Sequence, residues 1–466
     1  MSESRKATNA APAAASTLTA RWSEWSGGSS HRRVLAAGIT VALFTGVVQI
    51  ASLLKEVIVA GRFGTGDQLD AFFIAYLLPA FGINVLGWSL NSALVPAFLV
   101  IREKEGPAAA QAVLEGVTAR MLALLLALSI VLALAFPVLG RLLASSFSES
   151  KLELTTTLFF LILPSLTCSA VTAIWSGILN AHDDFGIAAA VPGLVPVAIV
   201  AAVVLFPHLG VHAIAGALTA GTALQCVVLG SALRRRGISV RPRWGALTPG
   251  IRDVFRQYAP AIGGALLASS TALVDQSMSA MLPAGSVATF NYGSKLVGAV
   301  LGIGMVAIGT AVLPQFSRLA AKSQWTELRE ALRRYTLLLL AALIPLTLVL
   351  VVFAEPIVRL VFERGAFAPV DTRRVAFIQQ LFALQIPFYL VGILVVRLIS
   401  ALRRNDILLW GAVGNVVLNV VFNYVLMKPL GVAGIALSTT FVYLLAASGL
   451  GIVLWRLIGR LEREAA

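Results

Sequence analysis

The 466-residue sequence has few charges and few of the residues that mark metal or redox centres. Only 12% of its residues are charged, about half the usual share in a soluble domain, whereas 58% are hydrophobic. Its two cysteines, Cys168 and Cys226, lie inside apolar runs, which argues against a disulfide framework. The four histidines lack zinc-ligand spacing, and no Walker-type phosphate-binding loop is present. The sequence therefore indicates no cofactor and gives no sign of ATP as an energy source.

Long apolar runs make up most of the chain and predict an all-α membrane protein. About 20 helical residues cross the hydrocarbon core of a bilayer, and a helix satisfies its own backbone hydrogen bonds there. Twelve runs reach that length: 34–60, 70–101, 121–147, 154–180, 185–206, 211–233, 258–282, 285–313, 335–361, 375–402, 407–427 and 432–458. We therefore expect a polytopic membrane protein with twelve transmembrane helices rather than an enzyme.

The basic residues predict the orientation in the membrane. The net charge is +14, and twenty-five of the 36 lysines and arginines fall in segments on the same side as the N-terminus, against eight on the other side. Positive residues favour the cytoplasmic side. We therefore expect both termini on the cytoplasmic side. The basic stretch 234–245 (RRRGISVRPRWG) is then a cytoplasmic loop and not a nucleic-acid-binding patch.

That loop divides the chain into two halves of six spans that resemble each other. "ALVPAF" (93–98) resembles "AVLPQF" (311–316), and "LGV" (209–211) recurs at 430–432. Because six is even, both halves share one orientation, as in transporters built from parallel repeats around a central substrate site. The predicted parts are a disordered cytoplasmic tail (1–33), an N-lobe (34–233), a basic cytoplasmic linker (234–257), a C-lobe (258–458) and a cytoplasmic C-terminal tail (459–466).

Six charged residues fall inside or at the start of apolar runs. They are Lys55, Glu56, Asp70, Asp275, Lys295 and Arg397. A charge at a helix centre costs about 2.5–3.5 kcal/mol on insertion scales, so each one is a candidate functional residue. The cations Lys55, Lys295 and Arg397 are candidate ligands of an anion such as a lipid diphosphate. The three acids are candidate charge partners or coupling sites.

Lys55 and Glu56 are neighbours whose side chains leave a helix about 100° apart. We therefore expect that they do not simply neutralise each other and that at least one faces a cavity. The alternative for Lys55 is a stretched side chain whose ammonium reaches the membrane interface beside Arg62. For Asp275 two interpretations are open: a structural pair with Lys295, and a site for a proton or coupling ion.

Two groups of asparagines lie in the spans. Asn84 and Asn91 are two helical turns apart, so we expect both to line the substrate cavity. Asn415, Asn419 and Asn423 are spaced by four and share one helix face. For this second row we favour a helix-packing seam over a substrate site.

Several stretches resemble the MurJ (MviN) lipid II flippases of the multidrug/oligosaccharidyl-lipid/polysaccharide exporter superfamily. They include "KEVIVAGRFGTGDQLDAFFIAYLLP" (55–79), "GILNAHDDFGIAAAVPGL" (177–194), "LVFERGAFAPVDT" (360–372) and "RLISALRRNDILLWGAVGNVVLNVVFNYVL" (397–426). The resemblance implies two six-helix lobes, as in the related MATE exporters, around a cationic cavity. It implies a bacterial cytoplasmic (inner) membrane as the location, and translocation of an undecaprenyl-diphosphate-linked saccharide from the inner to the outer leaflet of that membrane.

The resemblance also implies roles for single residues. Lys55 and Glu56 correspond to an Arg–Asp pair of the family's first helix, Asp70 to the aspartate of its DAF motif, and Lys295 to a second-lobe arginine. The family usually has fourteen spans where twelve are counted here, so lipid II and an exopolysaccharide repeat unit both stay open as substrates.

Expected partners are the lipid-linked saccharide, membrane lipids, and glycosyltransferases or a polymerase of the same pathway, with no nucleic acid. Two other functions are open. One is a MATE-type antiporter that exchanges protons or cations for drugs through Glu56 and Asp275. The other is a non-transporting scaffold of a polysaccharide assembly complex.

Overall fold

The computed structural model describes residues 30–465, and within that range the chain is built from helices and contains no β-strand. Most of the predicted disordered tail (1–33) lies outside the described residues, and the first helix begins at Ser30. At the other end, the last helix runs through the predicted C-terminal tail as far as Ala465.

The first half of the chain forms a bundle, the N-lobe. Its helices are α2 (Ser30–Phe63), α3 (Asp67–Gly82), α4 (Trp88–Lys104), α5 (Pro107–Leu143), α6 (Glu149–Ile162), α7 (Pro164–Asn180), α8 (Phe185–Ala190), α9 (Leu194–Leu205) and α10 (Val211–Arg235). A π turn, η1 (Ile83–Gly87), joins α3 to α4, and the 3-10 turns η2 (Val191–Gly193) and η3 (Pro207–Leu209) precede α9 and α10. Proline lacks the backbone N–H that a helix interior needs. Pro164 lies at the break between α6 and α7, and Pro192 lies in η2.

The helix α11 (Pro249–Ala280) leads into a second bundle, the C-lobe. Its helices are α12 (Ser286–Ala321), α13 (Trp325–Val352), α14 (Ala354–Phe362), α15 (Pro369–Ala383), α16 (Ile386–Ala401), α17 (Asn405–Leu430) and α18 (Val432–Ala465). The run α15–α16 is interrupted at residues 384–385, and Pro387 is the second residue of α16; the run α6–α7 is likewise interrupted at residue 163, before Pro164. The broken span thus recurs at the equivalent place in each half.

Eleven helical runs in the described part of the chain are long and apolar enough to cross a membrane. They correspond to eleven of the twelve predicted spans. The helix α11, predicted as the span 258–282, is not among them, because glycine, serine and threonine lower its hydropathy. The chain is therefore an all-α polytopic membrane protein, and the count of twelve spans stays a prediction.

Several helices extend beyond the apolar runs that predicted them. The helix α5 begins at Pro107 rather than at residue 121, and its 37 residues make a rod of about 55 Å. The helix α12 continues to Ala321 rather than 313. A hydrocarbon core is about 30 Å thick, so both helices project from the membrane.

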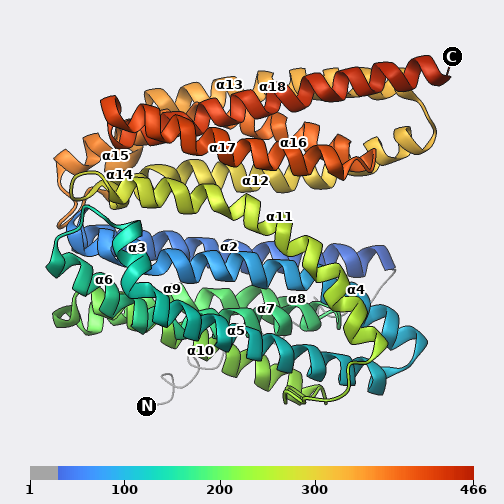
Figure 1. Cartoon of the computed structure of the whole chain (residues 1–466), viewed down its shortest axis with the longest axis horizontal. Coiled ribbons are helices and arrows are strands. Elements are labelled where there is room, and N and C mark those ends of the chain that lie inside the picture. The colour runs from blue at the N-terminus through green and yellow to red at the C-terminus, as the bar shows by residue number, and fades with distance from the viewer. Residues whose placement is uncertain (1–29, 466) are drawn as a thin grey trace, which may run out of the picture.

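The two lobes lie side by side, and α11 runs obliquely between them (Figure 1). It packs against α3 and α4 of the N-lobe and against α17 of the C-lobe. Apart from α11, the lobes contact each other mainly through α3 with α12 and α2 with α14. We name this region the docked end; it carries the loops 64–66, 281–285 and 363–368. One hydrophobic core crosses it, since N-lobe residues such as Phe72 pack with C-lobe residues such as Phe362.

Candidate functional site

Two cations from opposite lobes share one carboxylate oxygen. Lys55 and Glu56 lie on α2 of the N-lobe, and Lys295 lies on α12 of the C-lobe. Oε1 of Glu56 lies 2.8 Å from Nζ of Lys55 and 2.8 Å from Nζ of Lys295. The Glu56 side chain is 12% exposed, whereas that of Lys295 is 40% exposed. The three residues, which we name the lysine clamp, therefore connect the lobes and remain accessible on the Lys295 side.

The lysine clamp overturns two expectations. The geometric argument against contact between Lys55 and Glu56 is wrong, because helix geometry separates the Cβ directions of neighbours but not the far end of a four-carbon stem. The carboxylate is also shared with Lys295, so the pair does not simply neutralise itself. Pairing of Asp275 with Lys295 is also wrong, since Lys295 binds Glu56. The ammonium of Lys55 stays at the clamp instead of reaching Arg62, which donates to the carbonyl oxygen of Pro207.

The lysine clamp contains two positive charges and one negative charge, so it has a net charge of +1. An ammonium has three N–H donors, and the contact with Glu56 occupies one on each lysine. Because both ammoniums lie against the same oxygen, a small anion with several oxygens is able to contact both. Phosphate groups form strong charge-assisted hydrogen bonds with such cations. The arrangement therefore suits a diphosphate.

Asp70 joins the lobes by another contact. Its buried carboxylate accepts hydrogen bonds from the backbone N–H groups of Gly285, at 2.7 Å, and Ala288, at 2.8 Å, where α12 begins. Lys151 of α6 donates to the same carboxylate at 3.0 Å. A carboxylate at a helix N-terminus satisfies unpaired N–H groups and the positive end of the helix dipole. Asp70 of one lobe thus caps a helix of the other.

Two glycines let the loops of the docked end approach closely. Gly365 has φ +58°, and an added Cβ would lie 2.2 Å from the carbonyl oxygen of Gly61. Gly285 has φ +84°, and its Cβ would lie 2.3 Å from the carbonyl oxygen of Thr65. Both the backbone conformation and the packing therefore require glycine. Beside Gly365, the N–H of Ala366 donates to the Gly61 oxygen at 2.7 Å.

Side chains complete the docked end. Thr65 donates its hydroxyl to Oδ1 of Asp371 at 2.5 Å, between the lobes. Tyr292 of α12 is fully buried, with its ring centroid 6.4 Å from that of Phe73 in the N-lobe and 5.8 Å from that of Phe367 in the C-lobe. Edge-to-face aromatic pairs at such spacings are attractive. The lobes are thus closed against each other at this end.

Sequence reasoning did not find Lys151, Tyr292 or Asp371. Lys151 and Asp70 are 81 residues apart, and no local pattern predicts their contact. Tyr292 lies in the stretch 290–319 and Asp371 in the stretch 360–372, which both resemble the family, and that resemblance was the one available signal. A buried tyrosine in an apolar span otherwise looks like ordinary core.

Asp275 lies inside the C-lobe and away from the lysine clamp. Its buried Oδ1 accepts from the amide of Asn419 at 2.9 Å and from that of Asn423 at 2.6 Å. Ser438 of α18 donates to the side-chain oxygen of Asn423. These contacts link α11, α17 and α18, as a packing seam would. Within residues 30–465, no three His, Cys, Asp or Glu side chains gather as they would around a metal ion.

The remaining candidates lie in separate surroundings. Asn84 is exposed in the π turn η1, whereas the buried side-chain oxygen of Asn91 faces Gly177 of α7. The i→i+5 hydrogen bonding of a π turn changes the helix register between them, so the expectation of one shared face is wrong. Arg397 of α16 lies against Gly309 of α12, where an added Cβ would meet Nη2 at 3.1 Å.

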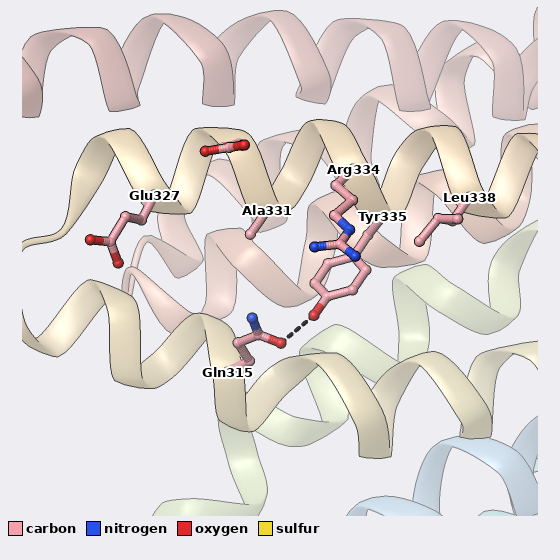
Figure 2. A pocket seen from close by; sticks show the side chains of 7 residues that line it. Gln315, Glu327, Ala331, Arg334, Tyr335 and Leu338 are labelled. Carbon is pink, nitrogen blue, oxygen red and sulfur yellow. Dashed lines mark hydrogen bonds between the residues drawn. The ribbon is translucent and has the colours of Figure 1, made fainter.

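A cavity of about 430 Å³ lies between α12 and α13, near their connection. Figure 2 shows Gln315 and Tyr335 joined by a hydrogen bond, with Arg334 beside them. Glu327 and Glu330 also line this cavity. It mixes both signs of charge and lies about 30 Å along α12 from Lys295, so it is separate from the lysine clamp.

The sequence matches one family along most of its length. Residues 59–463 match the family described as lipid II flippase MurJ. A probable lipid II flippase MurJ from Synechocystis sp. is 29% identical over 450 residues, covering 94% of this chain and 83% of the relative. The lipid II flippase MurJ of Burkholderia cenocepacia is 27% identical over 418 residues, covering 86% and 80%.

Two solved structures share the fold. A lipid II flippase MurJ in an inward closed conformation aligns with a TM-score of 0.75 at 22% identity, over 88% of this chain and 86% of that one. An inward-facing multidrug resistance MATE family transporter of the MOP superfamily aligns with a TM-score of 0.73 at 16% identity, over 92% and 99%. The predicted MOP-type pair of lobes is confirmed. Because the family match covers most of the sequence, this chain belongs to the lipid II flippase MurJ family, a family of transporters rather than enzymes.

Proposed function

We propose that this chain moves a polyprenyl-diphosphate-linked saccharide from the inner to the outer leaflet of the bacterial cytoplasmic membrane. The lysine clamp is the observation that supports this most directly, because Lys55 and Lys295 converge from two lobes on one oxygen of Glu56. A diphosphate is able to replace Glu56 as their shared anion. The charges of Lys55 and Lys295 then take part both in substrate binding and in the contact between the lobes.

The proposed orientation has both termini in the cytoplasm and the docked end toward the outer leaflet. The excess of basic residues on the N-terminal side supports it. In the described conformation the docked end is closed by Asp70, Thr65 and Gly365. The substrate therefore loads from the cytoplasmic side. Rocking of the lobes then opens the docked end, as in transporters with parallel repeats.

At the lysine clamp, the diphosphate replaces Glu56 as the partner of the two lysines. This exchange couples substrate binding to the movement of the lobes. When the diphosphate takes both ammoniums, the direct ion pair between Glu56 and Lys295 is lost and the substrate bridges the lobes instead. When the docked end opens and the substrate leaves, Glu56 recovers Lys295. The same carboxylate thus helps release the diphosphate and restores the contact between the lobes.

Lipid II is the substrate to test first, because the family and the curated relatives carry that name. An exopolysaccharide repeat unit on the same carrier presents the same diphosphate and is the alternative. The excess positive charge of the lysine clamp opposes a cationic drug, which argues against drug antiport although the MATE fold is shared.

Joining the lobes at the docked end should stop transport reversibly. The variant Thr65→Cys with Asp371→Cys, with both native cysteines changed to serine, places thiols where the native oxygens are 2.5 Å apart. We expect a short, reducible bifunctional thiol reagent to abolish lipid II translocation in proteoliposomes, and a reductant to restore it. The single variant Thr65→Cys should be insensitive to the reagent. Transport that continues through a crosslinked protein would contradict the rocking mechanism, and an inactive wild type would contradict the function.

We propose Asp275 as the coupling site for a proton or cation. It is a buried carboxylate held by Asn419 and Asn423, and no cation pairs with it among the described residues. Asp275→Asn keeps an acceptor oxygen and removes the charge. We expect translocation to lose its dependence on a sodium or pH gradient while the fold is retained. Asp275→Leu should instead lower the free energy of unfolding by about 1–3 kcal/mol, because two amides lose their acceptor. If translocation by Asp275→Asn still depended on the sodium or pH gradient, Asp275 would have only a structural role.

A further inference from the structure

A second cavity lies inside the C-lobe. It has a volume of about 330 Å³ and is bordered by α11, α16, α17 and α18. Its polar and aromatic lining consists of Thr271, Phe388, Tyr389, Asn415 and Tyr443. The other described residues that line it are aliphatic or glycine, and none of the lining side chains is charged. Such a wall suits a neutral ligand with both polar and apolar faces.

The cavity has unused hydrogen-bonding capacity. The side-chain oxygen of Asn415 is buried and has no hydrogen-bond partner among the described residues. An unpaired buried polar atom is costly, so a turn of the Asn415 side chain that lets a ligand hydroxyl donate to this oxygen is favoured. The rings of Tyr389 and Tyr443 meet edge to face, with centroids 4.9 Å apart. Ring faces for C–H groups together with an amide for hydroxyls are the chemistry that recognises a sugar.

An unpaired cation adjoins this cavity. Tyr389 and Ile393 line the cavity from α16, and Arg397 is the next residue on that helix face. Nε of Arg397 is buried without a hydrogen-bond partner, and no carboxylate lies within ion-pair distance among the described residues. Gly309 of α12 makes room for the guanidinium, because an added Cβ would meet it at 3.1 Å. The cavity thus has an anion-binding group one helical turn away.

The position of Arg397 relates it to the lysine clamp. Gly309 follows Lys295 by fourteen residues on α12, which places the two within about 40° on one helix face and about 21 Å apart along the axis. The guanidinium lies at this face of α12, farther from the docked end than Lys295. An anion that moves along α12 toward the docked end therefore meets Arg397 before the clamp.

We propose that Arg397 and the C-lobe cavity form a loading subsite for the head group of the substrate. Arg397 binds the diphosphate, and the cavity beside Asn415 and Tyr443 binds the first sugar. In a polyprenyl-diphosphate saccharide the sugar is bonded directly to the diphosphate, which matches a cation placed one turn from a sugar-sized cavity. The inference rests on the proposed function and assigns it a subsite distinct from the lysine clamp.

Two probes separate the two parts of this subsite. Undecaprenyl diphosphate carries the anion alone, and lipid II carries the anion with its saccharide. We expect Ala412→Leu, which fills the cavity, to weaken lipid II binding to the full chain in nanodiscs about tenfold and to leave undecaprenyl diphosphate binding unchanged. Arg397→Gln should weaken the binding of both probes about tenfold, with partial recovery in Arg397→Lys. Ala342→Leu, the same change at an exposed position of α13, is the matched control.

Each outcome has a defined meaning. Equal effects of Ala412→Leu on the two probes, or no effect on either, would overturn the saccharide subsite. If Ala412→Leu fails to fold, Asn415→Leu takes its place with the same expected contrast. A wild type that binds neither probe would overturn the proposed function together with the subsite. A wild type that binds both probes and depends on Lys295, yet is indifferent to Arg397→Gln and Ala412→Leu, would overturn the subsite alone. If a lipophilic cation such as tetraphenylphosphonium displaced both probes equally, the cavity would be a cation-binding site, and the saccharide subsite would be overturned.

Discussion

Lys295→Gln should lower translocation of the lipid-linked saccharide about 10- to 100-fold. The change removes one of the two ammoniums and leaves Glu56 with Lys55 alone. A hydrogen bond to a charged group contributes about 1.5–3 kcal/mol, and here the substrate loses that contribution at the point where it bridges the lobes. The rate is measured in proteoliposomes, by the exposure of the saccharide to an enzyme that does not cross the membrane.

Two further variants decide whether charge is the cause. Lys295→Arg keeps the charge and should retain most of the activity. Lys428→Gln removes an exposed lysine whose ammonium, among residues 30–465, contacts only Tyr424 one turn earlier in α17, and it should behave as wild type. Undiminished transport by Lys295→Gln would mean that the diphosphate binds elsewhere.

Gly365→Val should prevent the docked end from closing. The glycine has φ +58°, and its Cβ would lie 2.2 Å from the carbonyl oxygen of Gly61. A valine in this backbone region costs about 1–3 kcal/mol, and the clash adds to that cost by pushing the loops apart. We expect a lower midpoint of thermal unfolding and a loss of transport. A thiol introduced by Thr65→Cys should then react with a maleimide that does not cross the membrane.

The matched control for this change is Gly431→Val. Gly431 has φ +59°, but no atom of the described part of the chain lies within 4 Å of its added Cβ. Gly431→Val therefore imposes the same backbone strain without separating the lobes. We expect this variant to have reduced stability and to retain transport. If Gly431→Val stopped transport as completely, backbone strain would explain both variants and the docked end would not be the cause.

The membrane spans were predictable from local physics, but the helix ends were not. An apolar run reports only the part of a helix that lies in hydrocarbon. The first turns of α5, from Pro107, and the last turns of α12, to Ala321, contain polar and small residues that resemble loop sequence. The helix α11 shows the converse case, because its glycines and serines weaken the apolar signal of a helix that packs between the lobes.

The cost of burying charge identified the functional candidates. It did not predict which of them contact each other. Glu56 and Lys295 are 239 residues apart, so only the packed lobes bring them together. The contact between Lys55 and Glu56 depends on the rotamer of a long side chain, which the helical angle does not determine. Asp70 was identified as a candidate, but its backbone partners Gly285 and Ala288 offer no side-chain pattern to recognise.

Glu56 also affects which anions are excluded from the lysine clamp. The cytoplasm is rich in soluble phosphates and nucleotides, and a bare pair of lysines would attract them. A carboxylate fixed 2.8 Å from both ammoniums competes intramolecularly, so a dilute anion in solution displaces it poorly. A diphosphate on a polyprenyl chain is confined to the bilayer beside the site and so reaches a far higher local concentration. We therefore propose that Glu56 acts as a selectivity barrier that discriminates by membrane anchoring. Its removal by Glu56→Gln should leave the carrier open to inhibition by soluble phosphates and nucleotides.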